Sequence, residues 1–163
     1  MEFFDVVKAR RSVREFSDKP VAMEHLEMII DAGRRAPSGK NIQPREYIII
    51  TEKETIRQLG QVQSFIATSH AIIGVVTDTE ASQYWLEDAS AAIENMLLAI
   101  VDLGYASCWV EGTLLPKEDW AKDLLSVPEN KRLIALLPIG VPAAEGKQAA
   151  KRGLKEVLHY EKY

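Results

Sequence analysis

Three arginines and a serine stand close together near the start of the chain, in the run Arg10-Arg11-Ser12-Val13-Arg14. The guanidinium of arginine presents a planar fork of N–H donors that matches two oxygens of a phosphate at once. Several guanidiniums and a hydroxyl at this spacing can converge on one phosphate, so we expect a bound phosphate group here. A solvated basic turn is the alternative, because charge runs usually face water.

Four later segments also combine turn-forming residues with groups that can hold a ligand. In chain order they are 36–44, 108–113, 137–142 and the cationic pair Lys151-Arg152. The first is rich in amide and hydroxyl groups, and the second places a glycine turn, with its backbone N–H groups, after a strand. The glycine of the third permits close approach of another chain or ring. Each segment alone is explained as well by a loop, a strand end or a solvated tail.

Composition excludes several classes of function. The 163 residues fit a single domain, 1–163, and 47% of them are hydrophobic, enough for a sizeable core. Lys and Arg total 20 against 24 for Asp and Glu, and the net charge of −4 argues against a nucleic-acid surface. One cysteine, Cys108, excludes an intrachain disulfide, and no signal peptide is recognisable, so we expect a cytoplasmic protein. No apolar run approaches the roughly 20 residues that span a bilayer, and the three histidines form no metal set.

The hydrophobic pattern alternates between helices and strands. Apolar spacing predicts helices over 23–33, 83–103 and 117–125, a mostly helical linker over 51–70, strands over 47–50, 71–76 and 132–139, and a turn into a strand over 104–110. The β-branched runs suit strands covered on both faces. We therefore expect an α+β fold, a three-layer α/β/α sandwich of about four or five strands. Neither a Gly-x-Gly-x-x-Gly motif nor a P-loop occurs, so side chains must hold any phosphate.

Taken together and in this order, the motifs resemble the nitroreductase family of small FMN-dependent oxidoreductases that use NAD(P)H. Residues 10–14 are similar to the family's Arg-Arg-Ser-x-Arg motif, and 36–44 to its Ala-Pro-Ser-x-x-Asn-x-Gln-Pro loop. Residues 104–109 resemble its Gly-(Leu/Tyr)-Gly-(Ser/Thr)-Cys-Trp strand entry, with Ala106 where many members have Gly. Residues 137–142 resemble its Pro-x-Gly-x-Pro strand end, and the resemblance extends over nearly the whole chain.

The resemblance implies which residues bind FMN. Arg10, Ser12, Lys151 and Arg152 would hold its phosphate and ribityl chain. Arg14 would lie near the pyrimidine edge of the flavin, where a fixed cation stabilises the negative charge of the reduced ring. The complete implied set is Arg10, Arg11, Ser12, Arg14, Pro37, Ser38, Gly39, Asn41, Gln43, Glu111, Gly112, Pro138, Gly140, Lys151 and Arg152.

Around the flavin ring, the resemblance implies a contribution from a second protomer. The segment 37–39 of the other protomer would cover the ring, with Asn41 near the pyrimidine edge. Glu111 and Gly112 would line the ring face or the N5 edge. No catalytic acid or base is assigned, because the cofactor carries the chemistry. Three aromatic residues have two possible roles: Phe65, Tyr84 and Trp85 either cap a substrate pocket over the flavin or belong to the core or surface.

The resemblance further implies a central mixed sheet flanked by helices in an intertwined homodimer, with FMN at the interface. NAD(P)H would give hydride to flavin N5, and a nitroaromatic or quinone would then accept it in a ping-pong cycle. The apolar helix 83–103 would pack against its twin, or else be central to a monomer. Two other functions stay open: a flavin-binding sensor or carrier without turnover, and a module that binds phosphoanions or nucleic acid through the arginines alone.

Overall fold

A four-stranded sheet lies in the middle of the molecule, with its strands in the order β1-β2-β4-β3. The computed structural model describes residues 1–163. The strands are β1 (Arg45–Ile50), β2 (Ala71–Thr77), β3 (Ala106–Ser107) and β4 (Arg132–Gly140), and the α-helices are α1 (Phe3–Ala9), α2 (Met23–Arg34), α3 (Lys53–Leu59), α4 (Trp85–Asp102) and α5 (Glu118–Leu125). All predicted elements occur, although only two residues of the strand expected over 104–110 form β3.

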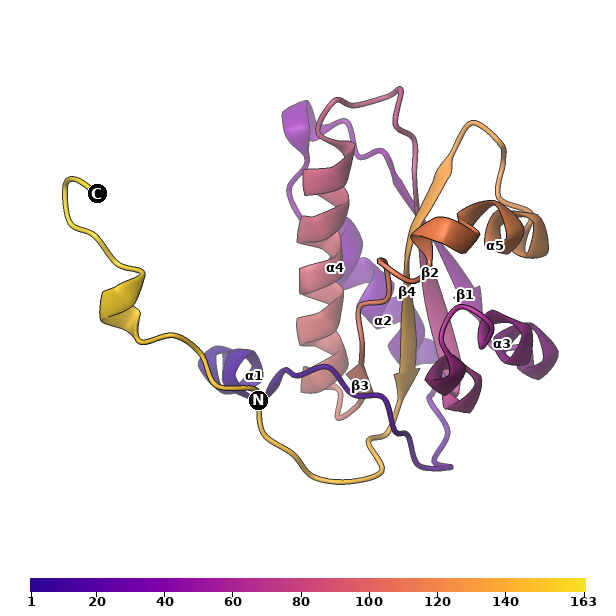
Figure 1. The fold of residues 1–163 in the computed structure, drawn as a ribbon, viewed down its shortest axis with the longest axis horizontal. Coiled ribbons are helices and arrows are strands. Elements are labelled where there is room, and N and C mark those ends of the chain that lie inside the picture. Colours follow the sequence, from indigo (N-terminus) through magenta and orange to yellow (C-terminus); the bar gives the residue numbers. More distant parts are fainter.

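Helices cover both faces of this sheet, as Figure 1 shows. On one face, α2 and α4 pack against β2 and β4 through a buried apolar cluster that includes Leu26, Ile93 and Ile73. On the other face, α3 and α5 close a second cluster, in which Ile56 accompanies Ile72. Consecutive residues of β2 thus enter opposite clusters, and this alternation explains why the strand has no polar position facing water. The expected three-layer α/β/α sandwich is confirmed.

Strand direction differs from the expected mixed sheet. The pairs β1–β2, β2–β4 and β3–β4 are all antiparallel. The one parallel pairing is an isolated bridge between Ser12 and Ser107. Burial on both faces is typical of parallel strands, but here it results from helices on both sides of an antiparallel sheet. An apolar run therefore indicates how a strand is covered and leaves its direction open.

The N-terminal segment continues the sheet beyond β3. The N–H of Val13 donates to the carbonyl of Ser107 at 2.9 Å, and further along Phe16 forms a bridge with Pro142. The ring of Phe16 lies against Gly140, where a Cβ would come within 2.8 Å of the ring atom Cδ1. The close approach predicted for this glycine is therefore made by a ring of the same chain.

The substitution Gly140→Ala should destabilise the protein by about 1–3 kcal/mol, because the added methyl group overlaps Phe16. Gly112→Ala is the matched control, since a Cβ at this position meets no atom within 4 Å. Its free energy of unfolding should stay within about 0.5 kcal/mol of the parent value. Denaturant unfolding measures both, and equal losses in the two variants would contradict the packing argument.

The segment after β4 leaves the body of the molecule. Figure 1 shows it passing α1 and ending far from the sheet. It holds one short 3₁₀ helix, Leu154–Glu156, and its large apolar side chains are exposed, among them Leu154 and Tyr160. We call residues 143–163 the tail. None of the helices, in the tail or elsewhere, has the length and apolar character needed to cross a membrane.

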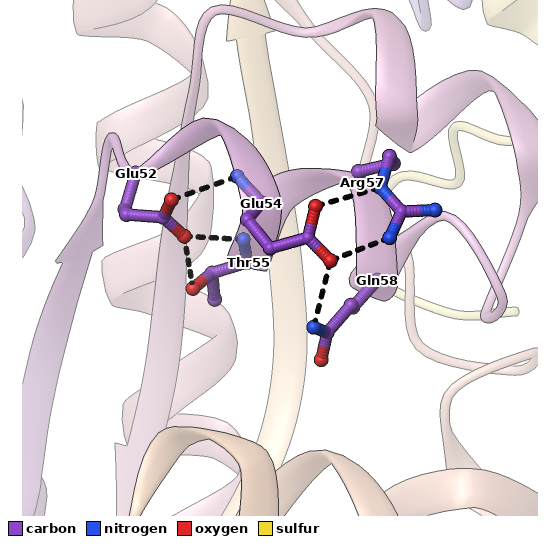
Figure 2. Close-up of polar contacts among 5 residues, drawn as sticks. All are labelled: Glu52, Glu54, Thr55, Arg57 and Gln58. Carbon is purple, nitrogen blue, oxygen red and sulfur yellow. Dashed lines mark hydrogen bonds and ion pairs between the residues drawn. The ribbon is translucent and has the colours of Figure 1, made fainter.

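Two glutamates fix the first turn of α3, in the linker predicted to be helical (Figure 2). The Glu52 carboxylate accepts hydrogen bonds from the hydroxyl of Thr55 at 2.6 Å and from the N–H of Glu54 at 3.0 Å. The Glu54 carboxylate accepts from Arg57 Nε at 2.8 Å and from Gln58 Nε2 at 2.9 Å. The hydrogen bonds from the Arg57 and Gln58 side chains lower the pKa of Glu54 to about 2.

Because the folded-state pKa of Glu54 lies below its ordinary value of 4.5, this group stabilises the fold above pH 4.5. That contribution is lost as the pH falls from 4.5 towards 2. Glu54→Gln should therefore make the melting temperature fall less steeply across this window, by a small amount because the side chain is exposed. Thermal melts of the variant, the parent and a Glu80→Gln control measure the slopes, and three identical slopes would refute the assignment.

Candidate functional site

The arginine cluster lies at the outer edge of the sheet, beside β3. Val13 is buried while its neighbours Ser12 and Arg14 are exposed, as expected for an extended segment whose side chains alternate. The hydroxyl of Ser107, across the bridge from Ser12, is buried and has no hydrogen-bond partner. Unpartnered buried polar atoms are rare in folded proteins and often mark functional positions.

Of the three arginines in this cluster, only Arg10 forms an ion pair with a carboxylate of the chain. Arg10 forms a long ion pair with Glu94, with 3.7 Å between Nε and Oε1. Neither Arg11 nor Arg14 forms an ion pair within the chain. Arg11 donates to a backbone carbonyl, and the Arg14 guanidinium lies 5.9 Å from the centre of the Phe65 ring. These two cations therefore remain available to an anion from outside the chain.

Two cavities adjoin the cluster and share Arg11. One, of about 270 Å³, is lined by residues 11–15 together with Ala144 and Glu145. The other, of about 430 Å³, is lined by Arg11 and residues 142–146. Glu15 and Glu145 face the first cavity along with the arginines, so its walls carry both signs of charge. The tail thus forms the second wall of a small polar cavity whose first wall is the arginine cluster.

The tail reaches the arginine cluster before its own cationic pair begins. Gln148 Nε2 donates to the carbonyl of Arg10 at 2.7 Å and to that of Val7 at 3.3 Å. Beyond this point, Arg152 Nη2 donates to the carbonyl of Glu156 at 3.0 Å. No hydrogen bond or ion pair joins Lys151 or Arg152 to the arginine cluster within one chain.

Gln148→Ala should release the tail from α1, because it removes both hydrogen bonds to backbone carbonyls. Two neutral hydrogen bonds contribute about 1–3 kcal/mol to local order. Trypsin should therefore cut the variant faster than the parent after Lys147 and Lys151. Tyr160→Ala, which changes an exposed tail residue, should leave the cleavage rate unchanged. A Gln148→Ala protein that is cut at the parental rate would contradict the docking of the tail.

A second group of predicted residues, the loop 37–43, lies beside the start of α4. Gly39 donates its N–H to Asp88 Oδ1 at 2.8 Å, and a Cβ on Gly39 would come within 2.3 Å of Cδ2 in the Tyr84 ring. Lys40 and Asn41 have φ angles of 52° and 57°, and Gln43 follows with 56°. Left-handed conformations in non-glycine residues cost free energy and cluster at functional sites.

The loop is held by residues that the sequence analysis did not single out. The buried guanidinium of Arg45 donates to the carbonyls of Ala36 at 3.0 Å, Pro37 at 3.2 Å and Asp88 at 2.8 Å. The Asp88 carboxylate, also buried, accepts from the hydroxyl of Ser82 at 3.3 Å. The sequence did contain one signal for this role: Asp88, one position before Ala89, is a charged residue on the buried face of an otherwise apolar helix.

The arginine cluster and the loop lie at opposite ends of the sheet. At one end of β4, Arg132 stacks on Trp85, with 5.8 Å between the guanidinium carbon and the ring centre. At the other end, Ile139 pairs with Ser107, which in turn bridges to Ser12. Ile139 lies seven residue steps along β4 from Arg132, or about 23 Å at the usual rise per residue. The predicted site residues therefore form two separate groups within one chain.

The predicted pocket aromatics are divided between the same two groups. Phe65 accompanies Arg14 at one end of the sheet, whereas Tyr84 and Trp85 lie with the loop at the other. Arg132 is also bound to Glu118, whose hydrogen bond raises the pKa of the guanidinium. One chain alone therefore does not assemble these three rings into a pocket.

The remaining predicted residues lie along β4. Val110 bridges to Leu136, which places Glu111 and Gly112 just beyond the middle of the strand. No atom lies within 4 Å of a Cβ built on Gly112, so its backbone is accessible. Pro138 is buried. It lies between Leu136, which bridges to Val110, and Ile139, which pairs with Ser107, so the pairing of β4 with this segment is interrupted at Pro138. The N–H that proline lacks is therefore not needed for a hydrogen bond between the strands.

No group of three or more His, Cys, Asp or Glu side chains is arranged to hold a metal ion. His25 Nδ1 lies 2.8 Å from the hydroxyl of Tyr105, and His70 Nε2 lies 3.0 Å from the carbonyl of Ser17. Cys108 is free and buried in the second apolar cluster. These residues have structural contacts of their own and are separate from the two groups described above.

The fold and these two groups define a three-layer α+β protein with an arginine-lined cavity at one end and a rigid polar loop at the other. A model of the nitroreductase family matches residues 7–64 and 60–141 of the chain. An Archaeoglobus fulgidus protein assigned as an NADH dehydrogenase/NAD(P)H nitroreductase is 32% identical, with 99% of each sequence covered. The chain therefore belongs to the nitroreductase family, and the expected family and oxidoreductase class are confirmed.

Solved structures agree with this assignment. A Bacteroides thetaiotaomicron protein assigned as an NADH dehydrogenase/NAD(P)H nitroreductase superposes with a TM-score of 0.93 at 27% identity, covering 100% of this chain and 99% of the other. An FMN-dependent nitroreductase from Clostridium difficile gives a TM-score of 0.89 at 26% identity, covering 98% and 99%. The superposition on the Bacteroides thetaiotaomicron protein covers all of this chain, including the tail.

Proposed function

We propose that this protein is an FMN-dependent oxidoreductase that transfers hydride from NAD(P)H to an electron-poor acceptor such as a nitroaromatic or a quinone. The observation that carries the proposal is the arginine cluster, where Arg11 and Arg14 line a cavity of mixed charge and neither forms an ion pair with a carboxylate of the chain. The FMN-dependent relative and the NAD(P)H-dependent relatives support the choice of cofactor. Bound FMN would supply the hydride chemistry at its N5, first taking hydride from NAD(P)H and, after NAD(P)+ leaves, passing it to the acceptor in a ping-pong cycle.

The side chains at the cluster fit a flavin phosphate. Arg10, Arg11 and Ser12 supply donors for phosphate and ribityl oxygens, and Lys151 and Arg152 add two cations from the tail. Arg14 is assigned to the pyrimidine edge, where its charge stabilises the negative charge of a reduced ring. Glu111 and the accessible backbone of Gly112 are assigned to the ring face, where an N–H can polarise the accepting nitrogen.

A second copy of the chain completes the site in this proposal. Within one chain the loop 37–43 and Ser12 lie near opposite ends of β4, whose residues Arg132 and Ile139 are about 23 Å apart, so we expect the loop not to reach a ligand held by the cluster of its own chain. A two-fold axis would bring the loop of one protomer to the cluster of its partner, and would do so twice. Exposed apolar residues on α1 and the tail, including Phe3, Phe4 and Leu154, suit an interface between protomers.

In this proposal, different residues hold the phosphate and the ring of the cofactor. The cations would hold the phosphate end, and the ring would then lie between Gly112, beside the middle of β4, and the partner's loop. The buried free thiol of Cys108 suits the proposed cytoplasmic location.

An absorbance spectrum of the purified protein, with FMN added, tests the function. We expect a flavin band in the visible that bleaches when NADH or NADPH is added without oxygen and returns when a quinone is supplied. A band that NAD(P)H leaves unchanged would contradict turnover and indicate a flavin-binding sensor or carrier. The absence of any bound flavin would overturn the proposal.

Arg11→Met should weaken FMN binding by about 10–100-fold, because a charge-assisted hydrogen bond to phosphate contributes roughly 1.5–3 kcal/mol. Lys19→Met removes one cation from an exposed position outside the cluster and should leave the affinity within about twofold. Titration of FMN into both variants at one salt concentration measures the difference. Equal affinities would show that Arg11 does not bind the phosphate.

A further inference from the structure

We infer that Arg45 and Asp88 are positioning residues for the loop 37–43, an inference that rests on the proposed function. Arg45 begins β1 and Asp88 lies in the first turn of α4, so the pair joins two elements that approach the loop from different sides. The Arg45 guanidinium is buried and has no carboxylate partner. Its charge is compensated by three backbone carbonyls, two of them from the residues that enter the loop, Ala36 and Pro37.

This network decides which groups of the loop can face a ligand. The N–H of Gly39 is already donated to Asp88, and the ring of Tyr84 occupies the space beside its Cα. Ser38 Oγ accepts the N–H of Gln43 at 3.1 Å. Gly39 is therefore an anchor of the loop, and the groups left for the flavin are those of its neighbours.

Two neighbours remain free to contact the flavin. Pro37 is exposed although its carbonyl is held by Arg45, and the side-chain amide of Asn41 has no hydrogen-bond partner in the chain. The exposed ring of Pro37 can cover a flat apolar surface, and the amide of Asn41 can pair with ring oxygens and nitrogens. We therefore assign ligand contact to Pro37 and Asn41, and anchoring to Gly39.

Backbone strain explains why the loop needs this support. Lys40, Asn41 and Gln43 all have φ between 52° and 57°, a conformation that costs about 1–3 kcal/mol for each non-glycine residue. The strain persists because Gly39 is tied to Asp88 on one side and Arg45 is buried on the other. If either tie is removed, the loop relaxes to ordinary backbone angles and Asn41 moves. Arg45 and Asp88 thus set the position of Asn41, which contacts the ligand, without contacting the ligand themselves.

The test compares Asp88→Ala with Asp88→Asn, both loaded with FMN. The asparagine keeps an oxygen that can accept the Gly39 N–H, so it should retain parental FMN affinity, whereas alanine should weaken binding by about 10–100-fold. Visible circular dichroism of the bound flavin should change in Asp88→Ala and stay parental in Asp88→Asn. Glu87→Ala, one position earlier on the exposed side of α4, should match the parent in both measurements. Parental affinity and dichroism in Asp88→Ala would overturn the inference.

Arg45→Lys provides a second variant if Asp88→Ala fails to fold. Lysine keeps the charge but lacks the planar fork that holds the Ala36 and Pro37 carbonyls together, so it should weaken FMN binding in the same range. A folded Arg45→Lys protein with parental affinity and dichroism would overturn the inference. A parent protein that binds no FMN would overturn the proposed function itself, whereas failure of the inference alone leaves parental binding and bleaching intact.

Discussion

The antiparallel pair of β2 and β4 is buried on both faces, and the other elements are placed against it. Residues of β2 alternate between the two apolar clusters, so neither strand can slip by one residue without exchanging its two buried faces. The length of β4 then keeps its ends apart. Trp85 is held at one end through Arg132, and Ser12 is held at the other through Ser107. This strand therefore keeps the arginine cluster and the loop 37–43 at opposite ends of each chain, and the proposed function takes them as two halves of a site shared between protomers.

The same residue type serves opposite purposes at the two ends of β4. Arg45 is buried and gives its donors to three carbonyls of its own chain, so it stiffens a loop. Arg14 is exposed and Arg11 is half-buried beside a cavity; neither has an acidic partner, so the donors that Arg11 does not give to the Ala144 carbonyl, and those of Arg14, are available to a bound anion. Burial and internal partners, more than side-chain chemistry, separate the structural arginine from the proposed ligand-binding ones.

Much of this organisation could be predicted from the sequence. Apolar periodicity predicted the helices and the three main strands, and the motif order identified the family. Strand direction could not be predicted, because an apolar run buried on both faces reads the same in either direction. Gly140 was predicted to allow close approach of another chain or a ring, but nothing in the local sequence pointed to Phe16. Arg45 and Asp88 were missed because the hydrogen bond that joins them spans 43 residues, although the charge of Asp88 on the buried face of an apolar helix was a local signal.

Subunit complementation tests most directly whether two protomers build each site. Protomers carrying Arg11→Met are mixed with protomers carrying Asp88→Ala under conditions that exchange subunits, and FMN binding is titrated before and after mixing. Half of the resulting dimers are mixed and each has one site without a substitution, so about one site in four should regain parental affinity. If mixing restores no high-affinity binding although mixed dimers form, each site is built within one chain, and the two half-sites do not combine across an interface.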